Sequence, residues 1–203
     1  MSISRTGLVL APCGAALLLL LAAPPARAQP GQPPPPPGAD FRKGLHLGFG
    51  VGGGSMSCES VGEEDICDAT IDQAGSVDFH IGLMLRPRLS INGEIWVMGH
   101  TEDYVTITNA ITTIGATLWL MPKLWLRGGI GGAVARWHYK GPLGLQLDDQ
   151  TESVPAVAAA AGFEVYSKPN FAIDIELRGG TGFYKDDQAK SHNAAVAVGF
   201  TWY

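Results

Sequence analysis

Three polar residues in the first half of the chain, His80, Ser90 and Glu94, are of the types that make up a hydrolytic triad. In such a site the serine attacks a carbonyl carbon, the histidine accepts its proton and the carboxylate orients the histidine. The alternative is a buried hydrogen-bond network that stabilises the fold, where polar triples of this kind arise without any catalytic role. We favour the network, and we expect no catalytic residues and no cofactor.

A second enzymatic hypothesis is a lipid-modifying hydrolase or transferase. Such an enzyme would need a histidine and a serine at the outer lipid interface. His138 and His192 lie near expected loops and Ser191 lies in a loop beside His192, so the sequence offers no convincing pair. The glycine-rich stretch from Gly50 to Gly54 lacks the Lys-Ser/Thr and the helix of a phosphate-binding loop, and close packing inside a narrow barrel explains it better.

Cys58 and Cys67 are spaced to close a short loop, and in an oxidising compartment they would form a disulfide. Two cysteines without a nearby histidine pair make a poor zinc site, so we expect no metal there. Clustered acidic residues in this loop and in two later ones could bind Ca²⁺ or Mg²⁺, or could keep the surface soluble. We favour the second role, since no calcium-binding spacing is present. The acidic loop residues are Glu63, Glu64, Asp65, Asp148, Asp149, Asp186 and Asp187.

Residues 1–28 have the features of a secretory signal peptide. Arg5 supplies the positive charge, a leucine-rich apolar run follows, and Ala26-Arg27-Ala28 provides the small residues that precede a cleavage site. A retained membrane anchor is disfavoured because the apolar run is short and is interrupted by proline.

Residues 29–40 contain five consecutive prolines, which cannot join a sheet, and they predict an extended periplasmic linker. The remaining residues, 41–203, form a single barrel domain. Removing the leader removes Arg5 and Arg27 and takes the formal net charge from −5 to −7. A chain this acidic is not expected to bind nucleic acid.

The barrel domain alternates with period two and contains no stretch apolar enough for a transmembrane helix. Tight turns marked by proline alternate with longer polar segments, which is typical of outer-membrane barrels. The pattern predicts an all-β fold, an eight-stranded antiparallel up-and-down transmembrane β-barrel. The expected strands are 43–54, 74–85, 88–99, 105–120, 124–138, 153–166, 171–183 and 192–203. The longer segments are 55–73, 100–104, 139–152 and 184–191.

The two faces of each expected strand differ in chemistry. From Val196 to Trp202 alternate apolar residues share one face, and the opposite face carries small residues. We expect the apolar faces to contact lipid, because the polar faces hold too few charges for a water-exposed surface. An eight-stranded barrel is just wide enough to be filled by side chains, and buried charges must be paired. The residues expected in this interior polar network are Asp78, His80, Glu94, Arg127, Glu164, Asp174, Glu176 and Arg178.

Charged and aromatic residues give a second signal. Thirteen of the nineteen acidic residues fall in the longer segments, whereas the tight-turn side carries cations. These cations are Arg42, Lys43, Arg86, Arg88, Lys123 and Lys168. Aromatic residues near the strand ends suit two interfacial girdles, although Trp96 and Trp125 fall on the expected inward face. The aromatic residues are Trp96, Trp119, Trp125, Trp137, Tyr139, Tyr166, Phe183 and Trp202.

These features make the sequence resemble the small outer-membrane β-barrel proteins of Gram-negative bacteria, the group that includes the transmembrane domain of outer membrane protein A. The most specific part is the C-terminal strand, Ala194 to Tyr203, which alternates and ends in aromatics as barrel-assembly signals do. Tyr203 departs from the pattern by one step. The resemblance implies a bacterial outer-membrane location, a lipid environment, and insertion with help from periplasmic chaperones and the barrel-assembly machinery. It implies no particular activity.

The function expected from the sequence is structural, namely a small integral barrel that supports the membrane or displays surface loops. A porin-like pore is disfavoured because water-filled channels need about sixteen strands, while slow leakage of small solutes stays open. The competing hypothesis is a soluble periplasmic, lipocalin-like barrel that binds an apolar ligand. The direction of the face from Val196 to Trp202 separates them, because only the soluble barrel would turn this face inward.

Overall fold

The computed structural model describes residues 42–60, 69–141, 146–184 and 189–203. The chain divides into two compact units, residues 1–37 and 38–203, and every described residue belongs to the second unit. The predicted signal peptide and linker lie outside the described residues. None of the described chain forms a helix with the length and hydrophobicity needed to cross a bilayer.

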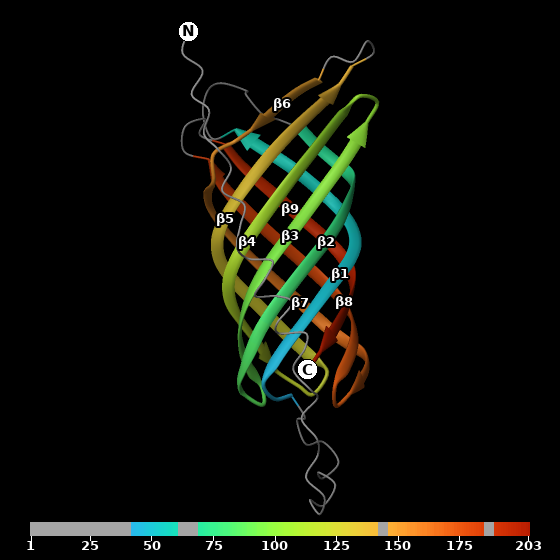
Figure 1. Ribbon diagram of the computed structural model, residues 1–203, viewed down its shortest axis with the longest axis vertical. Coiled ribbons are helices and arrows are strands. Elements are labelled where there is room, and N and C mark those ends of the chain that lie inside the picture. Colours follow the sequence, from blue (N-terminus) through green and yellow to red (C-terminus); the bar gives the residue numbers. More distant parts are fainter. Residues whose placement is uncertain (1–41, 61–68, 142–145, 185–188) are drawn as a thin grey trace, which may run out of the picture. The chain divides into compact units, whose positions relative to one another are not determined.

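The described residues form nine antiparallel strands in one sheet (Figure 1). The strand order is β4-β3-β2-β1-β9-β8-β7-β5-β6, and β4 also pairs with β5, so eight strands close into a barrel from which β6 extends. The predicted fold class is confirmed. The strands are β1 (Leu45–Ser60), β2 (Ala69–Arg86), β3 (Leu89–Glu102), β4 (Val105–Trp119), β5 (Leu124–Lys140), β6 (Gln146–Gln150), β7 (Val154–Lys168), β8 (Phe171–Tyr184) and β9 (Ala189–Trp202).

Three tight turns lie at one end of the barrel, called the turn end here, at Pro87, Pro122 and Pro169. Proline has no backbone N–H and cannot continue a strand ladder, so it suits the points where strands reverse. The opposite end is called the loop end. The C-terminal residue Tyr203 lies at the turn end, directly after β9 (Figure 1).

The strands are longer at the loop end than predicted. Residues 100–104 were expected to form a longer loop, and this expectation is wrong, because β3 and β4 leave only Asp103 and Tyr104 between them. Asp103 adopts a positive φ of 50°, which aspartate tolerates and which closes the hairpin tightly. The expected loop 139–152 likewise contains β6, which pairs with the end of β5. Strand segments that extend beyond the lipid still form backbone hydrogen bonds. They lack the alternation of apolar residues from which strands are predicted, so the sequence did not reveal them.

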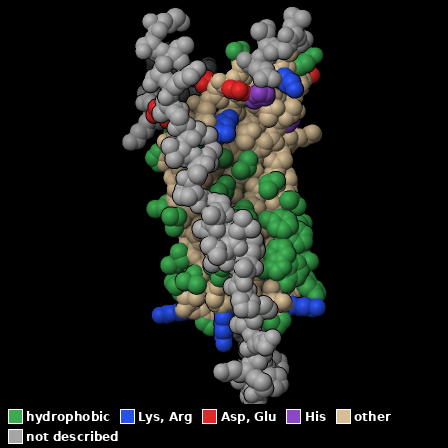
Figure 2. Space-filling model, in the orientation of Figure 1, with side chains coloured by type: hydrophobic (Ala, Val, Ile, Leu, Met, Phe, Trp, Pro, Cys, Tyr) green, Lys and Arg blue, Asp and Glu red, His purple; other side chains and the backbone are tan. Residues whose placement is uncertain are grey.

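The apolar faces of the strands point outward. Val196 is 56% exposed and Val198 is 42% exposed on β9, while Ala195 and Ala197 between them are buried. Figure 2 shows hydrophobic side chains over the barrel wall, with Lys and Arg at the turn end. The outward direction of this face argues against the soluble lipocalin-like alternative, whose apolar residues would line the interior.

Three tryptophans expected in the interfacial girdles lie inside the barrel instead. Trp96, Trp119 and Trp125 are each at most 4% exposed. Their side chains follow the inward parity of their strands, and arginines inside the barrel pack against their rings. Tyr166 and Trp202 are on the outside, where a girdle requires them.

Candidate functional site

The interior of the barrel is filled in successive levels. Trp119 and Trp125 form an apolar cluster near the turn end together with Ala160 of β7. A network of charged side chains occupies the middle. Toward the loop end a second apolar cluster follows, which includes Trp96, Met98, Ile111 and Met56.

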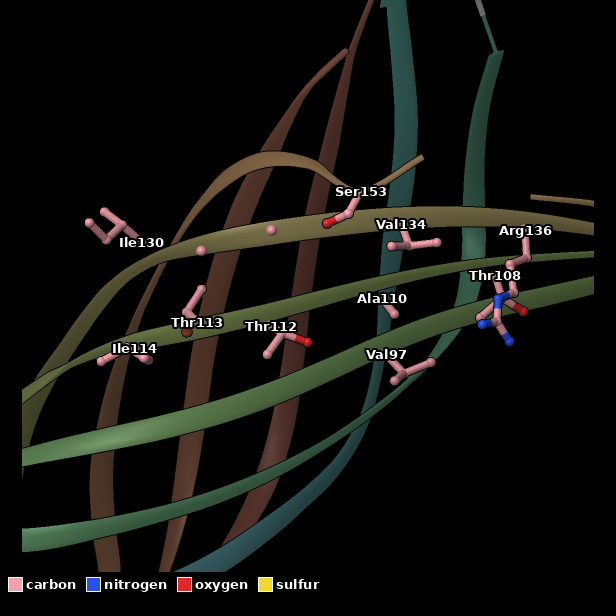
Figure 3. A pocket seen from close by; sticks show the side chains of 12 residues that line it. Val97, Thr108, Ala110, Thr112, Thr113, Ile114, Ile130, Val134, Arg136 and Ser153 are labelled. Atoms are coloured by element: carbon pink, nitrogen blue, oxygen red, sulfur yellow. The ribbon is translucent and has the colours of Figure 1, made fainter. Parts of the chain in front are cut away.

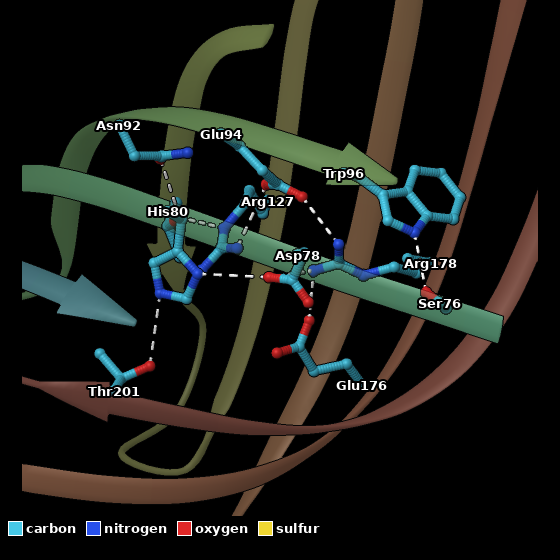
Figure 4. A network of polar contacts seen from close by, with 11 residues as sticks. Ser76, Asp78, His80, Asn92, Glu94, Trp96, Arg127, Glu176, Arg178 and Thr201 are labelled. Atoms are coloured by element: carbon cyan, nitrogen blue, oxygen red, sulfur yellow. Dashed lines mark hydrogen bonds and ion pairs between the residues drawn. The ribbon is translucent and has the colours of Figure 1, made fainter. Parts of the chain in front are cut away.

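Arg178 on β8 is the centre of the charged network (Figure 4). Its guanidinium nitrogens lie 2.9 Å from Glu94 Oε1 and 2.6 Å from Glu176 Oε2. They also lie 3.1 Å from Asp78 Oδ1. Four strands therefore contribute to the level, because Arg127 on β5 binds the second oxygen of Glu94 at 3.2 Å. Bringing one guanidinium into contact with three carboxylates lets it offset their charges away from water.

Neutral groups extend this network to the barrel wall. Arg127 Nε donates to Thr117 Oγ1 at 3.1 Å, and Thr117 donates to Asn92 Oδ1 at 3.0 Å. On the other side, His80 Nδ1 lies 3.5 Å from Asp78, and its Nε2 lies 3.4 Å from Thr201 Oγ1. The result is a continuous polar level across the barrel.

Each arginine of the network also lies over a tryptophan ring. Arg178 Cζ is 5.4 Å from the centre of the Trp96 ring, and Arg127 Cζ is 4.8 Å from that of Trp125. The Trp96 indole N–H donates to Ser76 Oγ at 2.9 Å. A guanidinium can stack on an aromatic face while its edge binds carboxylates, so the two apolar clusters and the charged level pack without a gap.

A second, smaller network closes the turn end. Arg42 Nη2 donates to Glu164 Oε1 at 2.6 Å and to the carbonyl of Pro122 at 2.7 Å. Trp119 Nε1 and Tyr203 Oη donate to the same carboxylate oxygen, at 3.0 and 3.3 Å. Burial raises the pKa of the Tyr203 phenol, and the nearby Glu164 carboxylate raises it further, so the phenol keeps its proton and acts as the donor.

This network corrects one prediction and explains another feature. Arg42 was expected among the cations of the turn-end rim, but its side chain is buried in the barrel against Glu164, because that carboxylate needs a charged partner. Tyr203 is one step out of phase with the outward face of β9, and that step turns its ring into the barrel, where it packs against His46.

Two glycines leave the space that the carboxylates occupy. A methyl group at Gly199 on β9 would collide with the side chains of Glu176 and Asp174. A methyl group at Gly50 on β1 would collide with Asp78 in the same way. Gly50 and Gly199 therefore make room for the charged side chains of neighbouring strands.

The structure places all eight residues of the predicted interior network inside the barrel, each with at most 8% of its surface exposed. Arg42 is the additional cation that the sequence analysis missed. Arg42 precedes the first strand, so it belongs to no run of alternating residues from which its direction could be predicted. The one signal in the sequence was that the expected interior network contains more acidic residues than arginines, which indicates a further cation.

The geometry does not assemble a catalytic triad. Glu94 accepts hydrogen bonds from Arg127 and Arg178, and His80 contacts Asp78 and Thr201. Ser90 is fully buried near the turn end, and its hydroxyl has no hydrogen-bond partner among the described residues. A buried serine whose hydroxyl is hydrogen-bonded to no base among the described residues is not an activated nucleophile.

The geometry does not support the lipid-modifying enzyme hypothesis either. Ser191 points into the barrel, whereas the next residue, His192, points out and contacts Thr181 and Glu59. Successive residues of a strand face opposite sides, so these two side chains cannot form a nucleophile–base pair. His138 on β5 pairs with Asp148 on β6 outside the barrel.

The predicted loop sites are only partly within the described residues. Asp148 and Asp149 are exposed on β6. Cys58 lies on β1 at the loop end, but Cys67 lies outside the described residues, so the disulfide stays a prediction. The other acidic loop residues also lie outside them, namely Glu63, Glu64, Asp65, Asp186 and Asp187. Within the described ranges, no group of three or more metal-ligating side chains is close enough to hold an ion.

A depression of about 590 Å³ lies along β4 and β5 (Figure 3). Ile114 and Ile130 lie at one end of it and Arg136 at the other (Figure 3). Gly131 and Gly132 leave its middle open because they have no side chains. Its lining contains no histidine or carboxylate, so it has no acid–base or nucleophilic pair.

Known structures match this barrel closely in fold. The attachment invasion locus protein Ail of Yersinia pestis, solved in complex with the heparin analogue sucrose octasulfate, superposes with a TM-score of 0.57. The match covers 79% of this chain and 99% of Ail at 14% identity. Neisserial surface protein A gives a TM-score of 0.57 over 79% of this chain and 97% of its own, at 12% identity.

No protein-family model and no curated protein sequence matches this chain. The structural matches confirm the predicted resemblance at the level of the fold: the chain is an eight-stranded barrel of the outer-membrane type. A barrel of this fold with an apolar outer face belongs in the bacterial outer membrane, as predicted.

Proposed function

We propose that this protein is a structural component of the bacterial outer membrane whose barrel carries a display platform at the cell surface, without catalytic activity. The observation that carries the proposal is the filled interior. Around Glu94, Trp96, Arg127 and Arg178 the remaining cavity is only about 10 Å³. A single water needs about that much space, so this level supports a scaffold rather than a pore.

The length of the strands supports the display role. A strand crosses the hydrocarbon core in about 9–11 residues, whereas β2 has 18 and β5 has 17. On β2 the outward apolar residues begin at Val77, so residues 69–76 extend past the apolar belt at the loop end. On β5 the outward residues change from Val134 to Arg136. The barrel wall therefore rises above the membrane and holds the loops away from it.

The surface chemistry of this platform differs from that expected for a receptor of sulfated sugars. Ail was solved with the heparin analogue sucrose octasulfate, a polyanion. In this chain thirteen of nineteen acidic residues belong to the loop-end segments. Like charges repel, so we do not carry that ligand over, and a basic ligand or divalent cations suit this end better.

The membrane-facing surface suits lipid and assembly factors. Acyl chains can fill the depression along β4 and β5, since the end of it opposite Arg136 is lined by Ile114, Ile130 and small residues. Apolar residues occupy alternate positions of β9 up to Trp202. We propose that periplasmic chaperones and the barrel-assembly machinery recognise the chain through this pattern.

The test is membrane fractionation of the expressed protein combined with its mobility on a detergent gel before and after boiling. We expect recovery in the outer membrane and a shift between unboiled and boiled samples, because a closed barrel resists detergent until heated. Recovery in the soluble periplasm would contradict the proposal and would revive the lipocalin-like alternative.

A further inference from the structure

The loop end of the barrel contains a cavity that the network does not fill. It has a volume of about 250 Å³ and is lined by residues of six strands, β1, β2, β4, β5, β8 and β9, and by Thr151 between β6 and β7. We call it the mouth pocket. Below it lies the apolar cluster of Met98, Ile111 and Trp96, which separates it from the charged level.

Four polar side chains at the mouth pocket lack partners. Asn193 is 4% exposed, and neither its amide nitrogen nor its amide oxygen has a hydrogen-bond partner among the described residues. The same holds for the amide oxygen of Asn109 (6% exposed) and the hydroxyl of Ser191 (7% exposed). The hydroxyl of Tyr184 is a fourth such atom. Buried polar atoms are nearly always paired. Other unpartnered atoms occur deeper in the barrel, but these four residues line a cavity of about 250 Å³, where a ligand can supply the partner.

Apart from Ser57 and Thr151, the rest of the lining is apolar. The larger apolar residues of the lining are Met56, Ile71, Ile107 and Trp137, and none of the residues that line the pocket carries a charge. An ionised ligand would lose its hydration here without gaining an ion pair. An apolar ligand without polar groups would leave the amides and hydroxyls unpaired.

We propose that the mouth pocket binds a small uncharged molecule with an apolar body and at least one amide or hydroxyl group. Ring stacking on Trp137 and contact with Ile107 hold the apolar part. The amides of Asn193 and Asn109 hold the polar part, as donor and acceptor. The volume lies just below the range of about 300–1,000 Å³ of pockets for drug-sized ligands, so the ligand is smaller than those.

The experiment uses the full chain folded in lipid nanodiscs and four small probes. Benzamide and benzyl alcohol are neutral and match the proposed chemistry, while benzoate and benzylamine have the same ring with a charge. The readout is the NMR shift of the side-chain amides of Asn109 and Asn193 during titration. We expect saturable shifts with the neutral probes and at least tenfold weaker binding of the charged ones.

Two pocket variants and one control locate the binding. Asn193→Leu removes the amide and Ala189→Phe fills the cavity, and each is expected to abolish saturable binding, followed for both variants by the Asn109 amide. Ala194→Leu, on the outward face of the same strand, is expected to leave binding unchanged. Folding of every variant is checked by its heat-dependent gel mobility.

The thermal stability of Asn193→Leu distinguishes a role of Asn193 in ligand binding from a purely structural role. Because its amide has no partner, Asn193→Leu is expected to keep the thermal midpoint of the barrel equal or to raise it. The proposal is overturned if neither neutral probe gives a saturable shift, if charged probes bind as well as neutral ones, or if both pocket variants still bind. A lowered midpoint in Asn193→Leu with binding retained would assign Asn193 a packing role instead.

Discussion

The middle of the barrel and its mouth both bury polar side chains, but among the described residues only the middle joins them by ion pairs within the barrel. At the level of Arg178, three carboxylates share one guanidinium and a second guanidinium binds Glu94 from the other side. At the mouth, the amide oxygen of Asn109, the hydroxyl of Ser191 and both amide atoms of Asn193 are equally buried and have no hydrogen-bond partner among the described residues. Since an unpaired buried polar group is destabilising, the first region serves the stability of the barrel and the second region is available for binding.

The largest effect is expected from Arg178→Leu. The substitution leaves Glu94, Glu176 and Asp78 without their shared cation inside the barrel. Breaking a buried ion pair by removing one partner lowers the free energy of unfolding by about 3–5 kcal/mol. Urea unfolding of the barrel in lipid vesicles measures this, with Arg86→Leu at the exposed turn-end rim as the matched control. Equal unfolding midpoints for the two variants would show that the network contributes nothing to stability.

The turn-end network predicts the next largest effect. Arg42→Met removes the charged donor to Glu164 while keeping most of the side-chain volume. Hydrogen bonds to charged groups contribute about 1.5–3 kcal/mol, and we expect a loss of that size in the same unfolding assay. Lys43→Met is the control, because Lys43 is exposed next to Arg42. Equal unfolding midpoints for the two variants would show that the contact between Arg42 and Glu164 does not stabilise the barrel.

Gly199→Ala tests the space that the carboxylates need. The added methyl group would meet Glu176 and Asp174, and overpacking of this kind destabilises by about 1–3 kcal/mol. At Gly93 on β3 the nearest atom to an added methyl group is 4.0 Å away, so Gly93→Ala is the control and is expected to unfold like the unmodified protein. A loss in the control as large as that in Gly199→Ala would point to strand propensity rather than crowding.

The smallest effect, and the sharpest form of the comparison, comes from two asparagines inside the barrel. Asn92 accepts a hydrogen bond from Thr117, so Asn92→Leu is expected to lower the free energy of unfolding by about 1 kcal/mol. Asn109 has an unpartnered amide oxygen, so Asn109→Leu is expected to leave stability unchanged or to raise it. The comparison fails if the two substitutions change stability in the same direction by the same amount.

The fold was largely predictable because its signals are local. Alternation placed the outward faces of β2, β3, β8 and β9, and the prolines placed the turns at Pro87, Pro122 and Pro169. The loop-end extensions were missed because strands above the membrane need no apolar face. Residues 100–104 show this most clearly, since threonine and glutamate there pair as well as valine does deeper in the barrel.

The interior was predictable in composition but not in pairing. Strand parity alone placed Glu94 and Arg178 inside, yet their contact joins β3 to β8, which are not neighbours in the sheet. Arg42 enters the barrel from before the first strand, where no periodicity applies. The unpartnered atoms of the mouth pocket depend on which side chains meet across the barrel, and no local pattern records this.

The account rests on a barrel whose middle level is closed by charged side chains in ion pairs, and conductance tests this closure most directly. The purified full chain is reconstituted into planar lipid bilayers, after its heat-dependent gel mobility has shown that it is folded. We expect no conductance above that of lipid alone, because the level of Glu94, Arg127 and Arg178 leaves a cavity of only about 10 Å³. Stable, voltage-independent conductance from the folded protein would contradict the account and would make the barrel a channel.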